Sequence, residues 1–263
     1  LGSVSSLLAP ITPFSAPRTC LNSSVNAVRS WSSVVFDLNR MKSFREAVPN
    51  STLNDVVLSI CAGALRAFLL ERDDLPIEPL VSLVPISERP TDQRGAMGNQ
   101  VSAMFAQLPT DVADPVQRLE QVVANMTAVK FSHNAVDANA LMQYSEFVPY
   151  GLAGFAARAA SEISAIEHVA PSCNCVITNV PGPQSPLYIG GHQLLANMGM
   201  GPIYDGIGIL ISVLSYNGAL SVSTTSSRNI MPDVQHFSEL MKNAANDFEK
   251  CLNSNQKAAK GSR

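Results

Sequence analysis

The sequence predicts an α/β domain built around a mixed sheet. Along the first two thirds of the chain, short β-prone runs alternate with helix-like segments, which is typical of a sheet covered by helices. Later, β-prone runs follow one another directly. Asn217-Gly218 joins two of them, and Asn-Gly is the strongest short hairpin pattern. Alternation early and hairpins late together favour one sheet with both parallel and antiparallel neighbours.

Composition limits the class of protein. The 263 residues, 46% of them hydrophobic, are enough for one large domain or two small ones with a sizeable core. Eighteen basic residues against 21 acidic ones give a formal net charge of −3, so a strongly basic nucleic-acid surface is excluded. Only 15% of the residues are charged, which favours apolar contacts with a partner, a lipid-like ligand or a membrane surface.

Cysteine and targeting patterns favour a cytoplasmic location. The cysteines at 20, 61, 173, 175 and 251 match no disulfide or zinc framework, so we expect reduced thiols. Cys173 and Cys175 lie two residues apart in a β-prone run, which predicts that both thiols face one side. The longest apolar run, 56–70, contains Arg66 and is shorter than the roughly 18 residues that span a bilayer. No basic region precedes the first apolar stretch, so a secretory signal is not expected.

Caps, breaks and periodicity predict the elements of the first half. Residues 1–33, rich in Ser, Pro, Asn and Thr, are expected to form a linker or arm. Thr52 and Asp55 form a capping box at the start of an apolar, buried helix over 51–71. Asp114-Pro115 begins an amphipathic helix, because proline is favoured at the first helical position. Strands are expected over 34–38, 79–86 and 100–108.

The sequence of the second half of the chain predicts helices at both ends and strands between them. Ala-rich sequence predicts one or two helices over 138–166, and an amphipathic helix closes the domain over 232–252. A strand over 173–180 precedes a small hairpin over 187–195, around Gly190-Gly191. Two further strands are expected over 207–215 and 219–225, and residues 253–263 are expected to form a flexible polar tail. The folded domain is therefore expected to span 34–252.

Few patterns suggest catalysis. His133 and Asp137 spell H-x-x-x-D, a pattern suited to acyl transfer, in which His takes a hydroxyl proton. They follow a helix, so an exposed His beside a capping Asp is the stronger reading. No nucleophile elbow or phosphate-binding glycine motif occurs. The glycines at 199, 201, 206 and 208 are expected to allow close backbone approach or a bulge.

Two polar segments are stronger candidates. Asn54-Asp55 lies in the first turn of the buried helix, where the residues either cap the helix or face a cleft. Asn179 ends a strand before Pro181-Gly182-Pro183, a stiff turn for which we expect a positive φ at Gly182. That turn either ends the strand or holds a loop rigid beside a site.

Several of these segments resemble the bacterial wax ester synthase/diacylglycerol acyltransferase family. The matches run in order along nearly the whole chain: Thr52–Leu58 with Cys61–Arg66, Leu83–Ser87 with Arg89, Gly98–Ser102, Leu108–Thr110, Asp114-Pro115, Arg118-Leu119, Lys130, Thr178–Pro183, Ser215–Gly218 and Pro232-Asp233. All of them belong to the family's C-terminal half. The chain departs from the pattern at Ser227, where the family often carries Asp before Arg.

The resemblance implies one half of a chloramphenicol acetyltransferase-like, CoA-dependent acyltransferase fold, with a tunnel between two halves. The H-H-x-x-x-D-G motif of the family lies in the N-terminal half, so no catalytic residue is expected in this chain. His133, preceded by Ser132, does not reproduce that motif. The complete protein would transfer a long-chain acyl group from acyl-CoA, which is a substrate, to diacylglycerol or a long-chain alcohol. Neither a metal nor a redox cofactor is implied.

The resemblance also implies roles for residues of this half. Asn54 and Asp55 would support the active site, and Asn179, Pro181, Gly182 and Pro183 would shape the tunnel or its contact with the other half. Val57, Ile60 and Leu108 are candidates for acyl-chain contact, although a core position is the stronger reading for each. The implied partners are the N-terminal half, the two substrates, and an inner-membrane or lipid-inclusion surface.

Three alternatives stay open at this point. The chain is a non-catalytic lipid-binding or scaffold module, a small acyltransferase that uses His133, or a degenerate member without activity. Because it begins with Leu1 rather than Met, we expect a processed, trimmed or partial protein.

Overall fold

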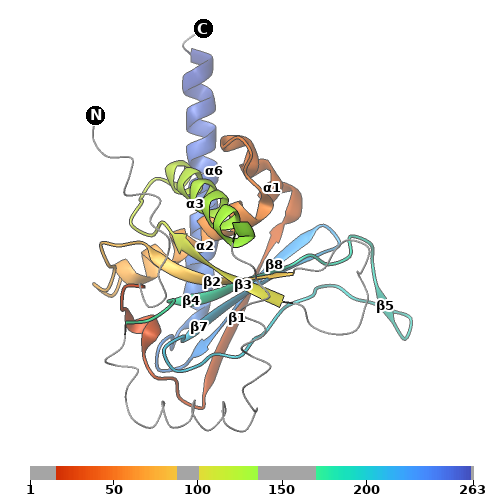
Figure 1. The fold of residues 1–263 in the computed structure, drawn as a ribbon. Coiled ribbons are helices and arrows are strands. Elements are labelled where there is room, and N and C mark those ends of the chain that lie inside the picture. The colour runs from red at the N-terminus through yellow and green to blue at the C-terminus, as the bar shows by residue number, and fades with distance from the viewer. Residues whose placement is uncertain (1–15, 88–100, 136–169, 262–263) are drawn as a thin grey trace.

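A six-stranded sheet with helices on one face forms the fold. The computed structural model describes residues 16–87, 101–135 and 170–261 (Figure 1). The strand order is β1-β8-β7-β4-β2-β3. The strands are β1 (Arg29–Asp37), β2 (Leu80–Ser87), β3 (Val101–Leu108), β4 (Cys175–Val180), β7 (Ile209–Tyr216) and β8 (Ala219–Ser227). β4 runs parallel to β2 and β7, and the other neighbours are antiparallel, so the predicted mixed sheet is confirmed.

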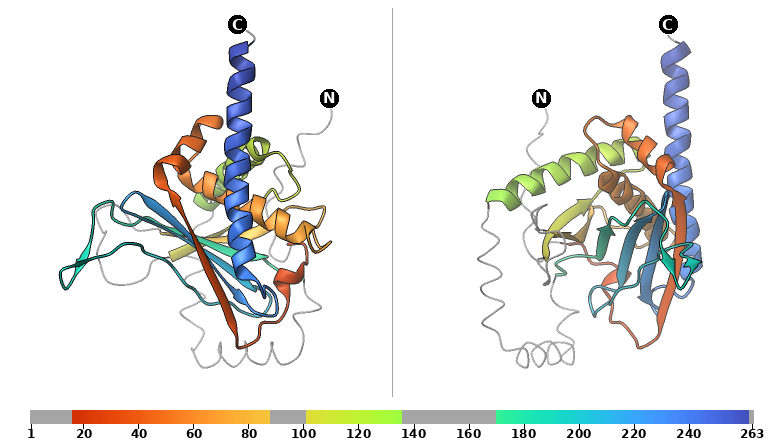
Figure 2. Two further views of the ribbon diagram at one scale, coloured as in Figure 1. Left: turned by 180° about the vertical axis from the view of Figure 1, so that it is seen from behind. Right: turned by 90° about the vertical axis from the view of Figure 1, so that its right-hand side faces the viewer.

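Four helices gather on one side of the sheet (Figures 1 and 2). They are α1 (Leu38–Ser43), α2 (Leu53–Leu70), α3 (Pro115–Ala135) and α6 (Val234–Gly261), with 3₁₀ turns η2 (Cys20–Asn22) and η3 (Phe44–Ala47). α2 lies at the centre and contacts both α3 and α6. The predicted helices over 138–166 lie outside the described residues.

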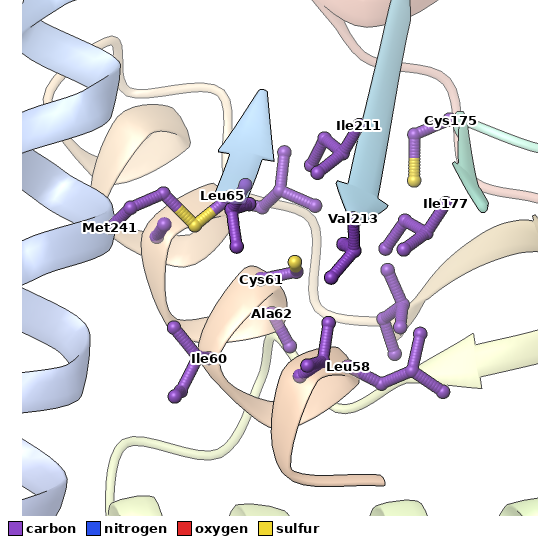
Figure 3. Packing of buried hydrophobic residues seen from close by; sticks show 14 of the residues in the cluster. Leu58, Ile60, Cys61, Ala62, Leu65, Cys175, Ile177, Ile211, Val213 and Met241 are labelled. Carbon is purple, nitrogen blue, oxygen red and sulfur yellow. The ribbon is translucent and has the colours of Figure 1, made fainter. Parts of the chain in front are cut away.

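α2 is the central helix of the hydrophobic core. As predicted, it begins with a capping box, in which Asp55 Oδ2 accepts from the backbone N of Thr52 at 2.8 Å. Figure 3 shows Leu58, Cys61 and Leu65 of this helix beside Ile177 of β4 and the β7 side chains. α2 is long and apolar enough to cross a bilayer, but 72% of it is buried inside the fold, as expected for a core helix.

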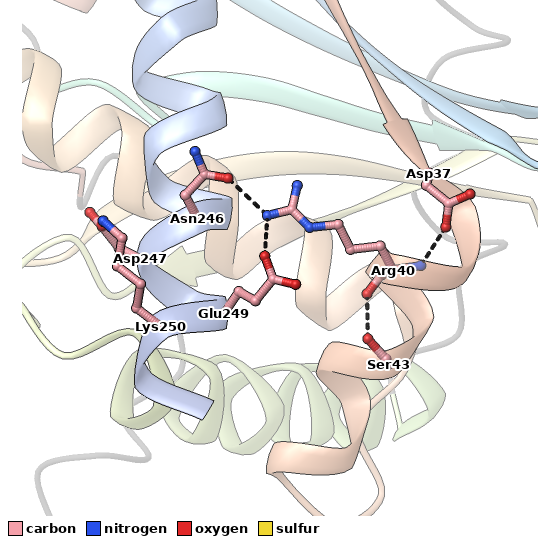
Figure 4. Close-up of polar contacts among 7 residues, drawn as sticks. All are labelled: Asp37, Arg40, Ser43, Asn246, Asp247, Glu249 and Lys250. Carbon is pink, nitrogen blue, oxygen red and sulfur yellow. Dashed lines mark hydrogen bonds and ion pairs between the residues drawn. The ribbon is translucent and has the colours of Figure 1, made fainter. Parts of the chain in front are cut away.

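Polar contacts tie α6 to α1. Arg40 Nη2 lies 2.8 Å from Glu249 Oε2 and donates to Asn246 Oδ1 at 2.8 Å (Figure 4). Asp37 caps α1, because its Oδ1 accepts from the backbone N of Arg40 at 2.7 Å. These groups are partly exposed, so the ion pair adds little to stability beside the stacking of Phe44 on Phe248 beneath it.

Both predicted hairpins are present. Asn217 (φ 44°) and Gly218 (φ 79°) join β7 to β8 in a turn with positive φ at both central residues, as a type I′ turn requires. Gly190 (φ 57°) and Gly191 (φ 82°) likewise join the short strands β5 (Tyr188–Ile189) and β6 (His192–Gln193). The glycines of the following segment allow close approach, as predicted: a Cβ at Gly199 would lie 2.4 Å from Ser212 Oγ.

The ends of the domain differ from the prediction. β1 begins at Arg29, so residues 29–33 belong to the sheet and not to a linker, because they pair with the end of β8. α6 continues to Gly261, so most of the predicted flexible tail over 253–263 is helical, and the helix extends beyond the body of the fold (Figure 2). Apolar periodicity ends near Leu252, but Gln, Lys and Ala are good helix formers and continue the helix.

The prediction that the cysteines are reduced was confirmed, but the prediction that Cys173 and Cys175 face one side was wrong. All five cysteines are free thiols, as expected. However, Cys175 packs in the main core, whereas Cys173 packs with Ala16 and Val81 in a separate cluster. The two thiols do not share a face because β4 begins only at Cys175. The buried Asn174 between them accepts from Val81 N at 2.8 Å through Oδ1 and holds the chain against β2.

Candidate functional site

Asn54 and Asn179 are joined at one end of the sheet. Asn54 lies in the first turn of α2 and Asn179 near the end of β4, 125 positions later in the chain. The Asn179 Nδ2 donates to Asn54 Oδ1 at 3.3 Å. Both side chains are half-buried, and each amide has further hydrogens and lone pairs beyond this bond. The structure thus brings together two residues that the sequence analysis singled out separately.

Asp55 is a capping residue with one unused oxygen. Its side chain is 3% exposed, and Oδ2 accepts from Thr52 N at 2.8 Å and from Thr52 Oγ1 at 2.7 Å. Oδ1 is buried without a hydrogen-bond partner among the described residues. An unpaired buried carboxylate oxygen costs about 1–3 kcal/mol or more. The capping interpretation is therefore confirmed, and the free oxygen leaves a second interaction available.

Ser59 lies one turn further along α2 and was missed by the sequence analysis. Its Oγ is also buried without a partner in the described part of the chain. Residues four apart share a face of a helix, so Asp55 and Ser59 place an unpaired acceptor oxygen and an unpaired hydroxyl on the same side of α2. A hydroxyl four residues after Asp55 was visible in the sequence. Only the structure shows that no group among residues 16–87, 101–135 and 170–261 forms a hydrogen bond with it.

The turn after β4 packs against the end of β7. Gly182 N donates to Ser215 Oγ at 3.1 Å, and a Cβ at Gly182 would lie 2.2 Å from the Ser215 carbonyl oxygen. Gly182 is not among the residues with positive φ, so that expectation was wrong. Glycine is needed here for close backbone approach instead. Pro181 and Pro183 flank it, and Pro183 O accepts from Asn217 N at 3.1 Å.

Gln184 fastens this turn and was missed by the sequence analysis. Its Nε2 donates to Ser215 Oγ at 3.2 Å and to Gly182 O at 3.0 Å, while its Oε1 accepts from Gly218 N at 3.1 Å. One amide therefore ties the proline turn to the β7–β8 turn. Asn179, three residues before Gly182, is held by the pairing of β4 with β7, in which it lies opposite Val213.

The candidate acyl-chain residues lie in the core. Val57 and Ile60 of α2 and Leu108 of β3 are all almost completely buried in the main hydrophobic cluster. Their packing is that of ordinary core residues. A contact with an acyl chain stays a prediction.

Arg118, part of the family-like segment Arg118-Leu119, has a structural role in the fold. It is buried, and its guanidinium donates to the carbonyls of Val112 and Ala113, in the loop before α3. Burial, reinforced by nearby Arg66, lowers the pKa of Arg118 to about 10. A Cβ at Gly63 would lie 2.6 Å from the Arg118 Nη1, so glycine on α2 provides the room for this side chain.

The histidines show no catalytic arrangement in the described residues. His236 Nε2 lies 2.7 Å from Glu71 Oε2 at the protein surface, between the start of α6 and the end of α2. His192 is exposed on β6. The side chain of His133 is not described, and Asp137 and His168 lie outside the described residues. Within the described ranges, no three His, Cys, Asp or Glu side chains form a group that could hold a metal ion.

Known proteins are similar to this chain in both sequence and fold. A model of the WS/DGAT C-terminal domain matches residues 97–249. The O-acyltransferase WSD of Acinetobacter baylyi is 35% identical over 227 residues, which cover 86% of this chain and 48% of that protein. The wax ester synthase/diacylglycerol acyltransferase of Marinobacter aquaeolei VT8 superposes with a TM-score of 0.72 and 27% identity, over 91% of this chain and 53% of that one.

A more distant structure shares the fold alone. The starter condensation domain of rhizomide synthetase has a TM-score of 0.51 and 15% identity, over 90% of this chain and 48% of that domain. These matches confirm the expected half of a CoA-dependent acyltransferase fold. The chain spans about half the length of the curated relatives it matches. It belongs to the wax ester synthase/diacylglycerol acyltransferase family, as that family's C-terminal domain.

Proposed function

We propose that this chain is the C-terminal half of an O-acyltransferase that moves a long-chain acyl group from acyl-CoA to diacylglycerol or a long-chain alcohol. The products are triacylglycerol or wax ester and CoA. Family membership and the names of the relatives support the reaction class. The observation that carries the proposal within this half is the Asn54–Asn179 hydrogen bond beside the unpaired oxygen of Asp55.

The proton chemistry comes from the other half in this proposal. A histidine of the H-H-x-x-x-D-G motif takes the proton of the acceptor hydroxyl, and the oxygen attacks the thioester carbon of acyl-CoA. The new C–O bond forms, the C–S bond breaks, and the departing CoA thiolate receives the proton from that histidine. No group on this chain has to gain or lose a proton.

The residues of this half act by positioning. An asparagine amide does not titrate near neutral pH but offers both a donor and an acceptor. The Asn54–Asn179 pair fixes the end of β4 to the start of α2, where the helix N-terminus favours negative charge. This arrangement can hold a polar loop or a substrate oxygen at the boundary between the halves.

We also propose a cytoplasmic enzyme that contacts the inner membrane or lipid inclusions peripherally. The proposed substrates are water-insoluble, and few residues of the chain are charged. In a flotation assay, the complete protein should rise with lipid vesicles. Recovery wholly in the soluble fraction would contradict the surface location without touching the acyl-transfer proposal.

The deciding experiment measures CoA release from palmitoyl-CoA and diacylglycerol. We expect no turnover by this chain alone and turnover by the complete two-half protein. Robust turnover by the chain alone, lost in His133→Ala, would instead establish a small self-sufficient acyltransferase. Inactivity of the complete protein, with lipid still bound, would support the lipid-binding module.

A further inference from the structure

The outer edge of strand β1 is open. Among the described strands, β1 pairs only with β8 and forms one margin of the sheet. Val28 O accepts a backbone hydrogen bond at 3.0 Å and Leu38 N donates one at 2.9 Å, each with a residue that flanks β8. Both backbone groups of a residue in an antiparallel strand point to one side, and this side alternates along the strand. Even-numbered residues therefore face β8, and the N–H and C=O groups of Trp31, Ser33 and Val35 point outward.

β1 lacks the features that usually protect an open edge. Protected edges are short, bulged, or interrupted by charged residues and proline. β1 has nine residues, pairs with β8 without a bulge, and carries no charge or proline between Arg29 and Asp37. Val35 is 46% exposed, on the opposite sheet face from the core residues Val34 and Phe36. A long uncharged edge of this kind is a template for pairing with another strand.

The strand is complementary to itself in antiparallel orientation. If two copies pair about a two-fold axis through Ser33, Trp31 lies opposite Val35 of the second copy, and Arg29 lies opposite Asp37 of the second copy. The outward backbone groups of both strands then meet in one ladder. Aromatic residues beside β-branched ones, and opposite charges, are favourable cross-strand pairs. A shift by two residues would place Arg29 opposite Val35 and leave outward groups unpaired at the strand ends.

We propose that two copies of the protein associate through β1 and join their sheets into one continuous sheet. The contact is two-fold symmetric and uses the same edge on both copies, so it closes at the dimer. This inference goes beyond the proposed function and does not depend on it, because neither acyl transfer nor any substrate enters the argument.

The surroundings of β1 favour a second copy over a lipid surface. α6 packs over β1, where Ser238 Oγ donates to Ser32 Oγ at 2.8 Å. A two-fold axis perpendicular to the sheet keeps both helix layers on one side, so α6 lies beside α6 of the second copy and enlarges the contact. Hydrocarbon, in contrast, offers no hydrogen-bond partner to the outward backbone groups.

Hydrogen–deuterium exchange, resolved by residue in the complete two-half protein, tests the pairing. In the dimer, all backbone amides from Trp31 to Val35 should be protected. On dilution, the outward amides of Trp31, Ser33 and Val35 should exchange many-fold faster, whereas those of Ser32 and Val34 stay protected by β8. Sedimentation should show the mass falling by half over the same concentration range.

Two results would overturn the proposal. A monomer at all concentrations, with fast exchange of the outward amides, would show that the edge stays open. Outward amides that are protected in a monomer would show that another part of the complete protein covers the edge.

A lysine on the edge tests the interface even if the dimer survives dilution. Burial of an aliphatic side chain is worth about tenfold in a binding constant, and both copies lose it, so Val35→Lys should raise the Kd of the dimer about 100-fold. Val28→Lys is the matched control, because Val28 is 49% exposed but precedes β1. It should leave the dimer intact. Equal weakening by both variants, or by neither, would refute association through β1.

A charge exchange tests the register. Arg29→Glu and Asp37→Lys should each weaken the dimer several-fold, because each places like charges opposite one another at both ends. The double variant restores opposite charges and should recover most of the affinity. Asp37 also caps α1, and the double variant still lacks that cap, so recovery identifies the charge pair as the cause. A double variant as weak as the single ones would overturn this pairing.

Discussion

Replacement of Gly182 by alanine tests the tightest approach in the candidate site. The added Cβ would lie 2.2 Å from the Ser215 carbonyl oxygen and 3.4 Å from its carbon. Both atoms are backbone of β7, which is held by β4 on one side and β8 on the other. The clash therefore cannot be relieved by a side-chain rotation. The turn has to move away from the sheet.

The magnitude follows from three contributions. Forced overpacking costs about 1–3 kcal/mol. Displacement of the turn also breaks the hydrogen bond from Gly182 N to Ser215 Oγ, at about 0.5–1.5 kcal/mol. Alanine restricts the unfolded chain more than glycine, which returns about 0.4–1 kcal/mol, since the φ of Gly182 is not positive. The expected net loss is about 0.5–4 kcal/mol.

Urea unfolding of the parent and variant chains measures this loss. Gly190→Ala is the control: it has a φ of 57° but no atom within 4 Å of the added Cβ. Strain at Gly190 lies at the tip of the exposed β5–β6 hairpin, where the turn can relax without moving the six-stranded sheet, so global stability should change by less than about 0.5 kcal/mol. The close-approach argument would be refuted if the Gly182→Ala variant were as stable as the parent protein. It would also be refuted if Gly190→Ala lowered stability more than Gly182→Ala.

Three further outcomes follow from the site and the core. Asn54→Ala or Asn179→Ala in the complete enzyme should lower the rate of CoA release by roughly twofold to tenfold, the value of one hydrogen bond, with the fold intact by circular dichroism; unchanged rates in both would exclude a positioning role. Asp55→Ala should impair transfer and also lower stability by about 0.5–2 kcal/mol, because it removes a helix cap, and a urea midpoint equal to that of the parent would contradict this. Burial raises the pKa of Cys175 to about 12 and raises that of Cys61 as well, both from a usual 9.0. The native state then holds protons that the unfolded state loses, so stability is complete below pH 9 and should fall above it, by about 1.4 kcal/mol per pH unit and thiol. Cys61→Ala should reduce this slope between pH 8 and pH 10, and an identical slope would contradict the assignment.

Local sequence patterns predicted the individual elements well. The capping box of Thr52 and Asp55, the helix start at Asp114-Pro115 and the Asn217-Gly218 turn were all found where their residues indicated. Each is a contact between residues a few positions apart, so its physics is contained in a short stretch of chain. The ends of β1 and α6 were less accurate, because pairing with β8 and plain helix propensity extend them beyond the apolar pattern.

Tertiary structure alone decided the arrangement of the site. The sequence determined by itself the α/β class, the buried helix α2 and a resemblance that identified the family and the half of it that this chain matches. It could not show that Asn179 meets Asn54, that Gly182 lies against Ser215, or that Cys173 and Cys175 pack on different sides. These contacts join segments far apart in the chain and depend on the order of strands in the sheet. The strand order depends on how the apolar surface of the whole chain is buried, so it cannot be predicted from any local sequence pattern.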